Sequence, residues 1–526
     1  MRHPAVLAIG ALITASVSAP HAVTPPVLPG PIGSLHRPIR TTVRETQRLF
    51  DQGLTLFYGF NREGARRSFA AAAALDPAAA MPHVGVALSF GPNLNTDSTV
   101  ADTTRGCTSA RRGARLSRQP DERAYADALV LRYCRGLSFD SSTEYAIELG
   151  TLFARRPDDP DAATLYADSL LMLRPRAGQQ NAELVAVLEL VLKRWPNHAG
   201  ANHYYVHAVE GSASPERGLA SARRLETLVP AVGHLLHMPS HIYTRLGDYD
   251  KAIESNVRAA AADLAYLESN AGDREQAMYH EHDVESLAVA LGSAGRFQRA
   301  EQVAATRIGG HGHGADVTTT ASGFSPLKLF VLLRFFRWHD VVQSPPPPQG
   351  DRTRVFHHFA QAVAHAQLKQ WPLAEAERQA FEREVDAVPA DAVYRSNQLQ
   401  AVLHVLHVIL EARVGSGRGN SAATIDAWRR AVAAQDQLTY HEPAPVYYPV
   451  RESLGAALFK AQRFGDAARV FQDDLARNPR SGRSLFGLWQ TLGALGRPGD
   501  AEAAHRRFLE AWATSDVALS LDDDEW

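Results

Sequence analysis

The stretch L-F-D-Q-G-L-T-L-F-Y-G-F-N-R-E-G-A-R-R-S-F-A-A-A-A-A-L-D-P, residues 49–77, decides the fold of this chain. Two amphipathic segments lie on either side of a turn, with small and aromatic residues at Gly53, Asn61, Ala65, Phe69 and Ala72. Apolar residues at these offsets are typical of helices. Asp76-Pro77 ends the second segment, because proline cannot continue a helix.

This pattern resembles a tetratricopeptide repeat, a helical hairpin of about 34 residues. The same frame recurs at Gly247-Asp248-Tyr249 with Ala252 and Ala259, Gly295-Arg296-Phe297 with Ala300, Arg337-Trp338 with Val341, Trp371 with Ala374, Phe464 with Ala467, and Gly496. Each hairpin has an apolar face that only a neighbouring hairpin can bury, so the hairpins stack. The sequence therefore predicts an all-α tetratricopeptide-repeat solenoid with a concave groove.

Five segments are expected along the 526 residues. Residues 1–22 are predicted to be a signal peptide, and residues 23–45, rich in Pro and Gly, a flexible leader. Residues 46–308 are the first repeat array. Residues 309–351 hold a Gly-rich loop with His311 and His313, one repeat and a proline-rich spacer, and residues 352–526 are the second array.

The first residues are typical of an exported protein. Arg2 precedes an apolar run, residues 5–17, and Val17-Ser18-Ala19 has the small residues that signal peptidase prefers, with Ala22 as a competing boundary. The run is short for a membrane span, although an uncleaved anchor remains the alternative. We expect a periplasmic or secreted protein with no membrane span after cleavage.

Charge and cysteine content narrow the classes of function. With 55 basic and 57 acidic residues and no long run of one sign, the sequence does not favour nucleic acid or an anionic membrane as a partner. The two cysteines, Cys107 and Cys134, are compatible with one disulfide in an oxidising compartment or with two unpaired buried thiols. In neither case is cysteine the metal ligand.

Eight side chains of metal-binding type cluster between Asn202 and Glu285. They are His203, His207, Glu210, His234, His237, His241, His282 and Glu285. Most are three or four residues from another, which places them on one face of a helix. In the repeat frame, all eight fall on the first helix of three consecutive hairpins, in one stripe. Three columns of ligands are therefore expected to converge in the concave groove.

The chemistry of this set favours a metal centre. Imidazole and carboxylate without thiolate suit zinc, copper, iron or manganese, and more than four ligands allow a dinuclear site or an outer shell that orients the inner one. Glu210 or Glu285 is expected to be a metal ligand or the general base on a metal-bound water. The alternatives are a hydrogen-bonding or peptide-binding groove, and histidines that serve only packing.

Tyr440-His441-Glu442-Pro443, followed by Tyr447-Tyr448, is dense in polar aromatic groups and precedes a helix. It is expected either to approach the groove from a later repeat or to form a rigid turn whose tyrosines pack on the next hairpin.

Several stretches of the chain resemble a family of bacterial exported tetratricopeptide-repeat proteins. The resemblance rests on D-P-A-A-A-M, G-P-N-L-N, P-D-D-P-D-A-A-T-L-Y-A, N-H-Y-Y-V-H-A-V-E-G-S, H-L-L-H-M-P-S-H-I-Y, Y-H-E-P, V-Y-Y-P-V-R and N-P-R-S-G-R-S-L-F-G-L, and it covers residues 50–516. It implies a helical repeat fold and export. By position, it carries over His203, His207, Glu210, His237, His241 and His282. Glu285 stands where relatives often have another histidine, and Arg176 where they often have tryptophan.

The sequence thus predicts an exported helical protein with a His/Glu centre for a divalent transition metal, acting as a hydrolytic or oxidative enzyme on a small molecule or peptide. A non-catalytic adaptor that binds a protein or peptide partner is the main alternative, since many repeat proteins bind partners in the groove. Metal sequestration without turnover is the third.

Overall fold

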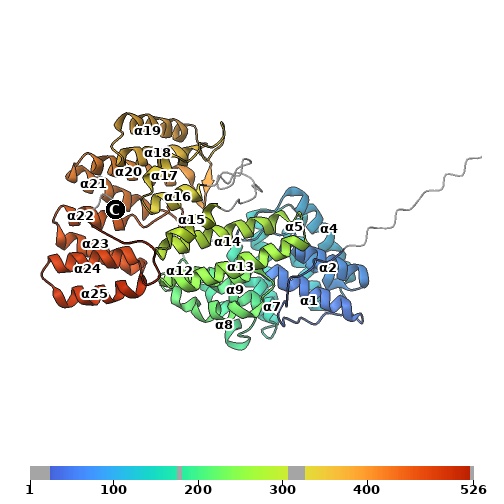
Figure 1. Cartoon of the computed structure of the whole chain (residues 1–526). Coiled ribbons are helices and arrows are strands. Elements are labelled where there is room, and N and C mark those ends of the chain that lie inside the picture. Colours follow the sequence, from blue (N-terminus) through green and yellow to red (C-terminus); the bar gives the residue numbers. More distant parts are fainter. Residues whose placement is uncertain (1–23, 174–180, 306–325, 522–526) are drawn as a thin grey trace, which may run out of the picture.

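The computed structural model describes residues 24–173, 181–305 and 326–521 (Figure 1). The predicted signal peptide, Arg176, His311 and His313 lie outside these ranges. Within them the regular structure is helical except for two short paired strands, which confirms the all-α prediction.

The helices of the first half are α1 (Arg44–Tyr58), α2 (Arg62–Leu75), α3 (Ala80–Leu88), α4 (Val100–Leu116), α5 (Pro120–Cys134), α6 (Phe139–Arg155), α7 (Pro160–Met172), α8 (Ala182–Arg194), α9 (Ala199–Val209), the 3-10 helix η1 (Pro215–Gly218), α10 (Leu219–Leu228), α11 (Gly233–His237), α12 (Pro239–Leu246), α13 (Tyr249–Ser269), α14 (Arg274–Ser293) and α15 (Phe297–Ala305). The second half contains α16 (Leu327–Arg334), α17 (Trp338–Val342), α18 (Arg354–Gln367), α19 (Trp371–Asp386), β1 (Val393–Tyr394), β2 (Asn397–Gln398), α20 (Leu399–Gly417), α21 (Ser421–Gln435), α22 (Arg451–Lys460), α23 (Phe464–Arg477), α24 (Gly482–Ala494) and α25 (Pro498–Ala511).

The repeat frame appears in the backbone as a recurring turn. In the described ranges, a residue with φ between 57° and 74° ends the first helix of eight hairpins: Phe60, Gly247, Gly295, Phe336, Lys369, Gly419, Gln462 and Gly496. Five positions later comes a buried, mostly small residue: Ala65, Ala252, Ala300, Val341, Ala374, Thr424, Ala467 or Ala501. This spacing confirms the helical repeats, and it adds the hairpin α20–α21, which the sequence frame had missed.

The helices form two groups, each around its own core. The helices from α1 to α12 share one hydrophobic cluster, which Tyr279 of α14 joins, and the helices from α16 to α25 share another. A smaller cluster from α12 to α16 lies between them, so α13 and α14 run through the middle of the molecule (Figure 1). Pro345–Pro348 lies in the connection between α17 and α18, and the helices on both of its sides belong to the same core.

Residues 24–43 have no helix or strand, but they are held against the first array. Val27 exchanges two hydrogen bonds with the side chain of Asn270, at 3.2 and 2.8 Å. Arg37 donates to Asp159 at 2.7 Å. These contacts fix a segment that the sequence analysis expected to be flexible.

The two helix groups also touch through their turns. Gly247 ends α12 with φ of 72°, and a side chain there would lie 2.8 Å from Cβ of Arg480. Phe297 N donates to Asp516 at 2.7 Å. In the first group, Cys107 of α4 and Cys134 of α5 form a disulfide bond, which answers the question left open by the sequence.

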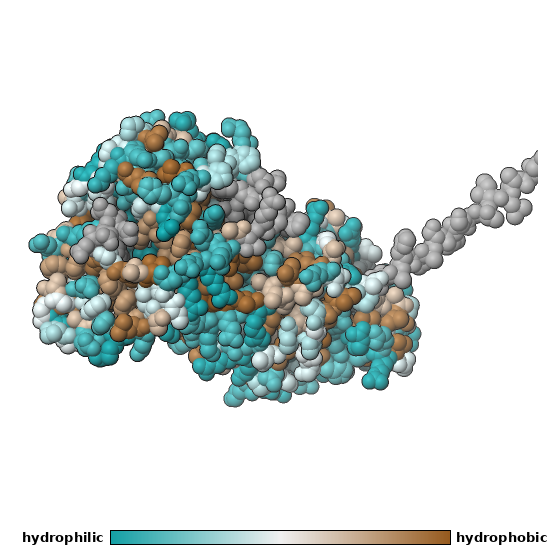
Figure 2. Space-filling view, in the orientation of Figure 1, coloured by the Kyte–Doolittle hydropathy of each residue, from teal (hydrophilic) through white to brown (hydrophobic). Residues whose placement is uncertain are grey.

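In the space-filling view, apolar and hydrophilic residues are interspersed over the visible face (Figure 2). Among the described residues, no helix combines the length and apolar character needed to cross a membrane.

Candidate metal centre

Seven of the eight predicted residues come together between α9, α11, α12 and α14. His203 and His207 lie on α9, with Glu210 at its C-terminal end, His234 and His237 lie on α11, His241 lies on α12 and His282 lies on α14. These are the first helices of three successive hairpins, as the repeat frame predicted. Within each of the three groups His203/His207/His234, His237/His241/His282 and His207/Glu210/His241, one ligand atom per residue lies within 4.8 Å of the others.

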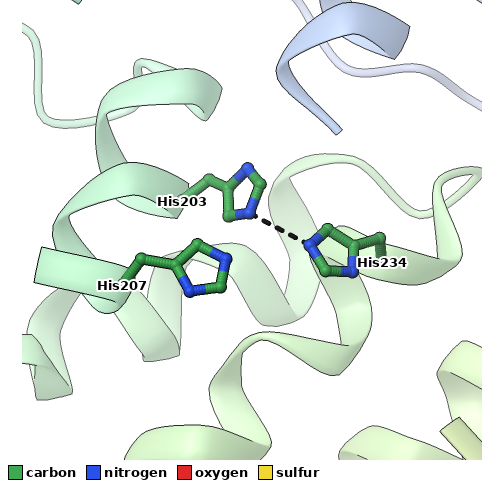
Figure 3. A group of neighbouring side chains, drawn as sticks. All are labelled: His203, His207 and His234. Carbon is green, nitrogen blue, oxygen red and sulfur yellow. Dashed lines mark hydrogen bonds between the residues drawn. The ribbon is translucent and has the colours of Figure 1, made fainter. Parts of the chain in front are cut away.

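We call His203, His207 and His234 the inner trio. Figure 3 shows two rings from one helix and one ring from another, all turned toward each other. Nε2 of His203 lies 3.1 Å from Nε2 of His234. Nε2 of His207 is buried without a hydrogen-bond partner among the described residues. An orphaned buried imidazole nitrogen needs an explanation, and a bound ion is one.

His237, His241 and His282 form the outer trio. Nε2 of His237 lies 2.7 Å from Nε2 of His241 and 3.1 Å from Nε2 of His282. Two nitrogens on one tetrahedral ion, each about 2.0–2.1 Å from it, lie about 3.3 Å apart. The His237–His282 spacing is close to this value, and the His237–His241 spacing is shorter.

In four of the six rings a hydrogen-bond acceptor holds the opposite nitrogen, Nδ1. Nδ1 of His203 lies 2.6 Å from the carbonyl oxygen of Tyr58, and a carbonyl can only accept. Nδ1 of His237 lies 2.6 Å from Oδ1 of Asn256, whose Nδ2 donates to the carbonyl of Ala252. Both Nδ1 atoms therefore carry the proton, and both Nε2 atoms carry a lone pair.

Glu210 fixes the other two rings in the same way. Its Oε1 accepts from Nδ1 of His207 at 3.1 Å, and its Oε2 accepts from Nδ1 of His241. One carboxylate thus orients an imidazole of each trio. Histidine ligands of metals generally donate their second nitrogen to a carboxylate or carbonyl, which sets the tautomer and the ring orientation.

This donor set fits a transition metal. Nε2 of His237 and Nε2 of His241 face each other with lone pairs, since both Nδ1 atoms donate elsewhere. Two lone pairs at 2.7 Å repel unless a cation lies between them. Either a proton or a metal ion supplies that charge, and imidazole suits zinc, copper and iron.

Burial argues against a proton on four of the rings. It lowers the pKa of His203, His234, His237 and His282 well below the ordinary value, and the charges of neighbouring imidazoles lower these values further. His241 differs: burial opposes its charge, but Glu210 raises its pKa above the usual value. Burial would raise the pKa of Glu210, yet His241 and His207 hold it far below the usual range. Most of the rings are therefore neutral at pH 7, the state that binds a metal.

Aromatic rings surround the inner trio. The ring of Phe60 lies 4.5 Å from that of His203 and stacks on His234 at 5.1 Å. The ring of Tyr279 lies 4.7 Å from His234 on the side of α14. Phe60 has φ of 58°, a left-handed conformation that is costly for a residue with a side chain. The repeat turn imposes that conformation and directs the ring at the histidines.

Charged groups of the second helix group border the outer trio. Glu442 is half-buried and interacts electrostatically with His241 and Glu210. Burial raises the pKa of Glu442 to about 7; His241 opposes this increase, and the charge of Glu210 adds to it. Tyr440 donates to Glu442 at 3.2 Å and packs against the guanidinium of Arg245. The segment therefore approaches the site, and its tyrosines also pack on neighbouring helices, since Tyr447 stacks on Phe330 of α16.

A buried pair of acids lies behind His237. Oδ1 of Asp283 lies 3.3 Å from Nδ1 of His237, and Asp263 packs against Asp283. Burial raises the pKa of both carboxyls, that of Asp263 to about 8. Gly233 is required here, because a side chain at that position would overlap Oδ1 of Asp263.

One expectation about the site needs correction, and the catalytic role of Glu285 stays a prediction. Glu285 lies outside the three ligand groups and forms an ion pair with Arg395. The histidines also do not line an open groove: His203, His234, His237 and His241 are buried, and only His282 and His207 are partly exposed. The groove is filled here because α1 lies against α9 and brings Tyr58 and Phe60 onto the rings.

Sequence reasoning missed the residues that support the ligands. Asn256 lies on the second helix of its hairpin, outside the stripe that was searched, and Phe60 is about 140 residues from His203 along the chain. The carbonyl of Tyr58 has no sequence pattern at all. Only the Tyr440–Pro443 segment carried a signal, its density of polar aromatic groups.

Comparisons with known proteins add little to this geometry. No protein-family model matches the chain, and no curated protein resembles it in sequence. Among solved structures, it is similar to the human IFIT1 dimer with m7Gppp-AAAA, at 12% identity and a TM-score of 0.34 over 90% of this chain and 92% of that one. The human IFIT1 dimer with PPP-AAAA gives 11% identity and a TM-score of 0.33 over 88% and 90%.

Proposed function

We propose that this protein is a metal-dependent enzyme whose active centre is the His/Glu cluster between α9, α11–α12 and α14. One observation carries the proposal: the Nε2 atoms of the imidazoles face one another at 2.7–3.1 Å, while acceptors hold the Nδ1 atoms of His203, His207, His237 and His241. A cluster that served only packing would not need four acceptors to aim lone pairs inward.

Different residues bind the metal, orient the rings and transfer protons in this proposal. The inner trio and the outer trio each offer three imidazole nitrogens, enough for two ions that share Glu210 as the group orienting one ring of each trio. Bound there, zinc, iron, manganese or copper would supply a Lewis acid or a redox centre, so hydrolysis and oxidation both remain in the proposal. Glu442, with its raised pKa, is placed to take or give a proton on the outer side.

The proposal includes export to the periplasm or the exterior. The apolar run near the N-terminus, the resemblance to exported repeat proteins and the disulfide between Cys107 and Cys134 support it. Disulfides persist mainly in oxidising compartments.

Elemental analysis of untagged protein tests the metal centre. We expect close to one or two equivalents of a transition metal per chain, lost in the double variant His203→Ala/His237→Ala with the helical circular dichroism retained. His365→Ala is the matched control, because His365 is also buried but lies in α18 with Gln370 as its partner. Wild-type protein without metal would contradict the proposal and leave the adaptor interpretation.

Measurement of turnover distinguishes an enzyme from a protein that only sequesters metal. Metal-loaded protein is assayed with aryl esters for hydrolysis and with phenols and dioxygen for oxidation. We expect turnover in one assay, reduced in Glu442→Gln with the metal content unchanged. Stoichiometric metal with no turnover in either assay would favour sequestration.

A further inference from the structure

A pocket lies beside the metal centre, at the junction of the two helix groups. It is open to solvent and is bordered by α14, α16, the strand pair and residues 444–447. Glu285 is one of its lining residues and lies three positions after His282 on α14. Residues three apart share a helix face, so the pocket begins one turn from the outer trio.

Glu285 and Arg395 form an ion pair, and both line the pocket. Arg395 acts electrostatically on His282, as does His441, so this pair lies close to the only outer-trio ring that is partly exposed. A molecule in the pocket would therefore meet the metal centre through Glu285, Arg395 and His282.

The rest of the lining is apolar and rich in aromatic rings. Phe330 and Tyr447 lie parallel, with ring centroids 5.2 Å apart, and Phe335 and Tyr394 complete the aromatic part. Leu327, Val289 and Val331 add aliphatic contacts. Pockets of this composition favour flat apolar rings, because aromatic side chains stack on them or meet them edge-on.

The charges of the lining are matched in pairs. Arg395 pairs with Glu285, and the buried Arg334 pairs with Glu452 through two hydrogen bonds. A charged ligand would lose its hydration without gaining an uncompensated partner, so the pocket favours an uncharged one. A carboxylate accepts several hydrogen bonds, so Glu285 can accept one from a ligand hydroxyl while it remains paired with Arg395.

We infer that this pocket binds a small uncharged phenol, with its ring among Phe330, Phe335 and Tyr447 and its hydroxyl donating to Glu285 beside His282. The inference rests on the proposed function, because it names the class of substrate on which the proposed metal centre would act. Binding itself depends only on the pocket, and it can be measured with or without metal.

Gly292 offers a way to fill the pocket without a clash. It lines the pocket in the last turn of α14, and a methyl group added there would meet only Phe335, at 3.9 Å. Gly292→Leu should therefore place its side chain in the cavity, and leucine favours the helix over glycine. Gly493→Leu is the matched control, because Gly493 is also the penultimate residue of a helix, is exposed and has no heavy atom within 4 Å of an added methyl group.

The probe is 2-naphthol, followed by its fluorescence in metal-free and metal-loaded protein. We expect saturable binding of one molecule per chain, weakened roughly tenfold or more by Gly292→Leu and unchanged by Gly493→Leu. Naphthalene should bind roughly tenfold or more weakly, because it lacks the hydrogen bond to a charged carboxylate. The anion 2-naphthoate should bind more weakly than 2-naphthol.

Three results would overturn the inference: no saturable binding of 2-naphthol, equal binding by the wild type and Gly292→Leu, or tighter binding of 2-naphthoate. If Gly292→Leu does not fold, Ala444→Trp, at an exposed lining position in the loop, takes its place. If the protein binds 2-naphthol but takes up no metal, the proposed metal-dependent function is contradicted and the phenol-binding pocket is supported. If the protein takes up metal but does not bind 2-naphthol, the phenol-binding pocket is contradicted and the metal centre is supported.

Discussion

The inner and the outer trio are built from the same residue type on the same stripe of three hairpins, yet their surroundings differ. Phe60 and Tyr279 cover the inner trio with aromatic rings. The outer trio has the partly exposed His282 and the charged groups Glu442 and Arg395 from the other helix group nearby. The difference indicates a closed inner site that supports the structure and an outer site at which chemistry is accessible.

This contrast follows the general division between metal sites. Structural sites are saturated by protein ligands, whereas catalytic sites keep a position for water or substrate. Aromatic rings cover His203 and His234, which are buried, whereas His207 is partly exposed. The outer rings lie one helical turn from the pocket that begins at Glu285.

Removing the aromatic cover should cost far more stability than changing the polar border. Phe60→Ala is expected to lower the free energy of unfolding by about 3–5 kcal/mol, because it leaves a cavity beside buried imidazoles. Glu442→Gln should change it by less than about 1 kcal/mol, since Glu442 is half-buried. Urea denaturation of the metal-free protein measures both.

Phe139→Ala is the size-matched control for Phe60→Ala. Phe139 is exposed, so its removal should change the free energy of unfolding by about 0.5 kcal/mol or less. Equal destabilisation by Phe60→Ala and Glu442→Gln would remove the proposed contrast between a closed and an accessible trio.

The second prediction concerns the groups that orient the rings. Glu210→Gln should weaken metal binding at both trios by about 10–100-fold, because Glu210 holds one imidazole of each. Asn256→Ala should weaken only the outer trio, since Asn256 holds His237 alone. Competition with a chelator, resolved into two sites, measures each affinity.

A matched loss at both sites in Asn256→Ala would show that the trios bind a single shared ion. Complete loss of metal in Glu210→Gln would assign Glu210 as a ligand rather than an orienting group.

The third prediction uses pH. Below about pH 6.5 the unfolded chain takes up protons that buried imidazoles of lowered pKa do not, so the metal-free protein loses stability as the pH falls. Each such ring contributes up to about 1.4 kcal/mol per pH unit. His203→Leu should therefore flatten the dependence between pH 6.5 and pH 5.

His241→Leu should act above about pH 6.5, where it removes a dependence of the opposite sign. Glu210 raises the pKa of His241, so His241 stabilises the fold at low pH and this stabilisation is lost as the pH rises through its folded value. Thermal unfolding from about pH 5 to about pH 8 measures both effects, with His365→Ala as a control. A change of the same sign in both variants would refute the assigned protonation states.

Much of the fold was accessible from the sequence because its cause is local. A small residue at Ala65, Ala252 or Ala467 allows two helices to pack closely, and each of these follows a left-handed turn residue by five positions. The hairpin at Gly419 was not predicted, because Thr424 replaces the expected small apolar residue. The same stripe gave seven of the eight candidate ligands correctly as neighbours, since spacing along a helix fixes which face a side chain occupies.

By itself, the sequence determined the helical hairpins and the alignment of His203, His237 and His282 on three neighbouring first helices. The tertiary structure alone decided that α1 closes over α9, that the carbonyl of Tyr58 and Asn256 set the tautomers, and that Glu285 turns to Arg395. The reason is physical: helical periodicity depends on residues a few positions apart, whereas burial and hydrogen-bond partners depend on segments brought together only when the hairpins stack.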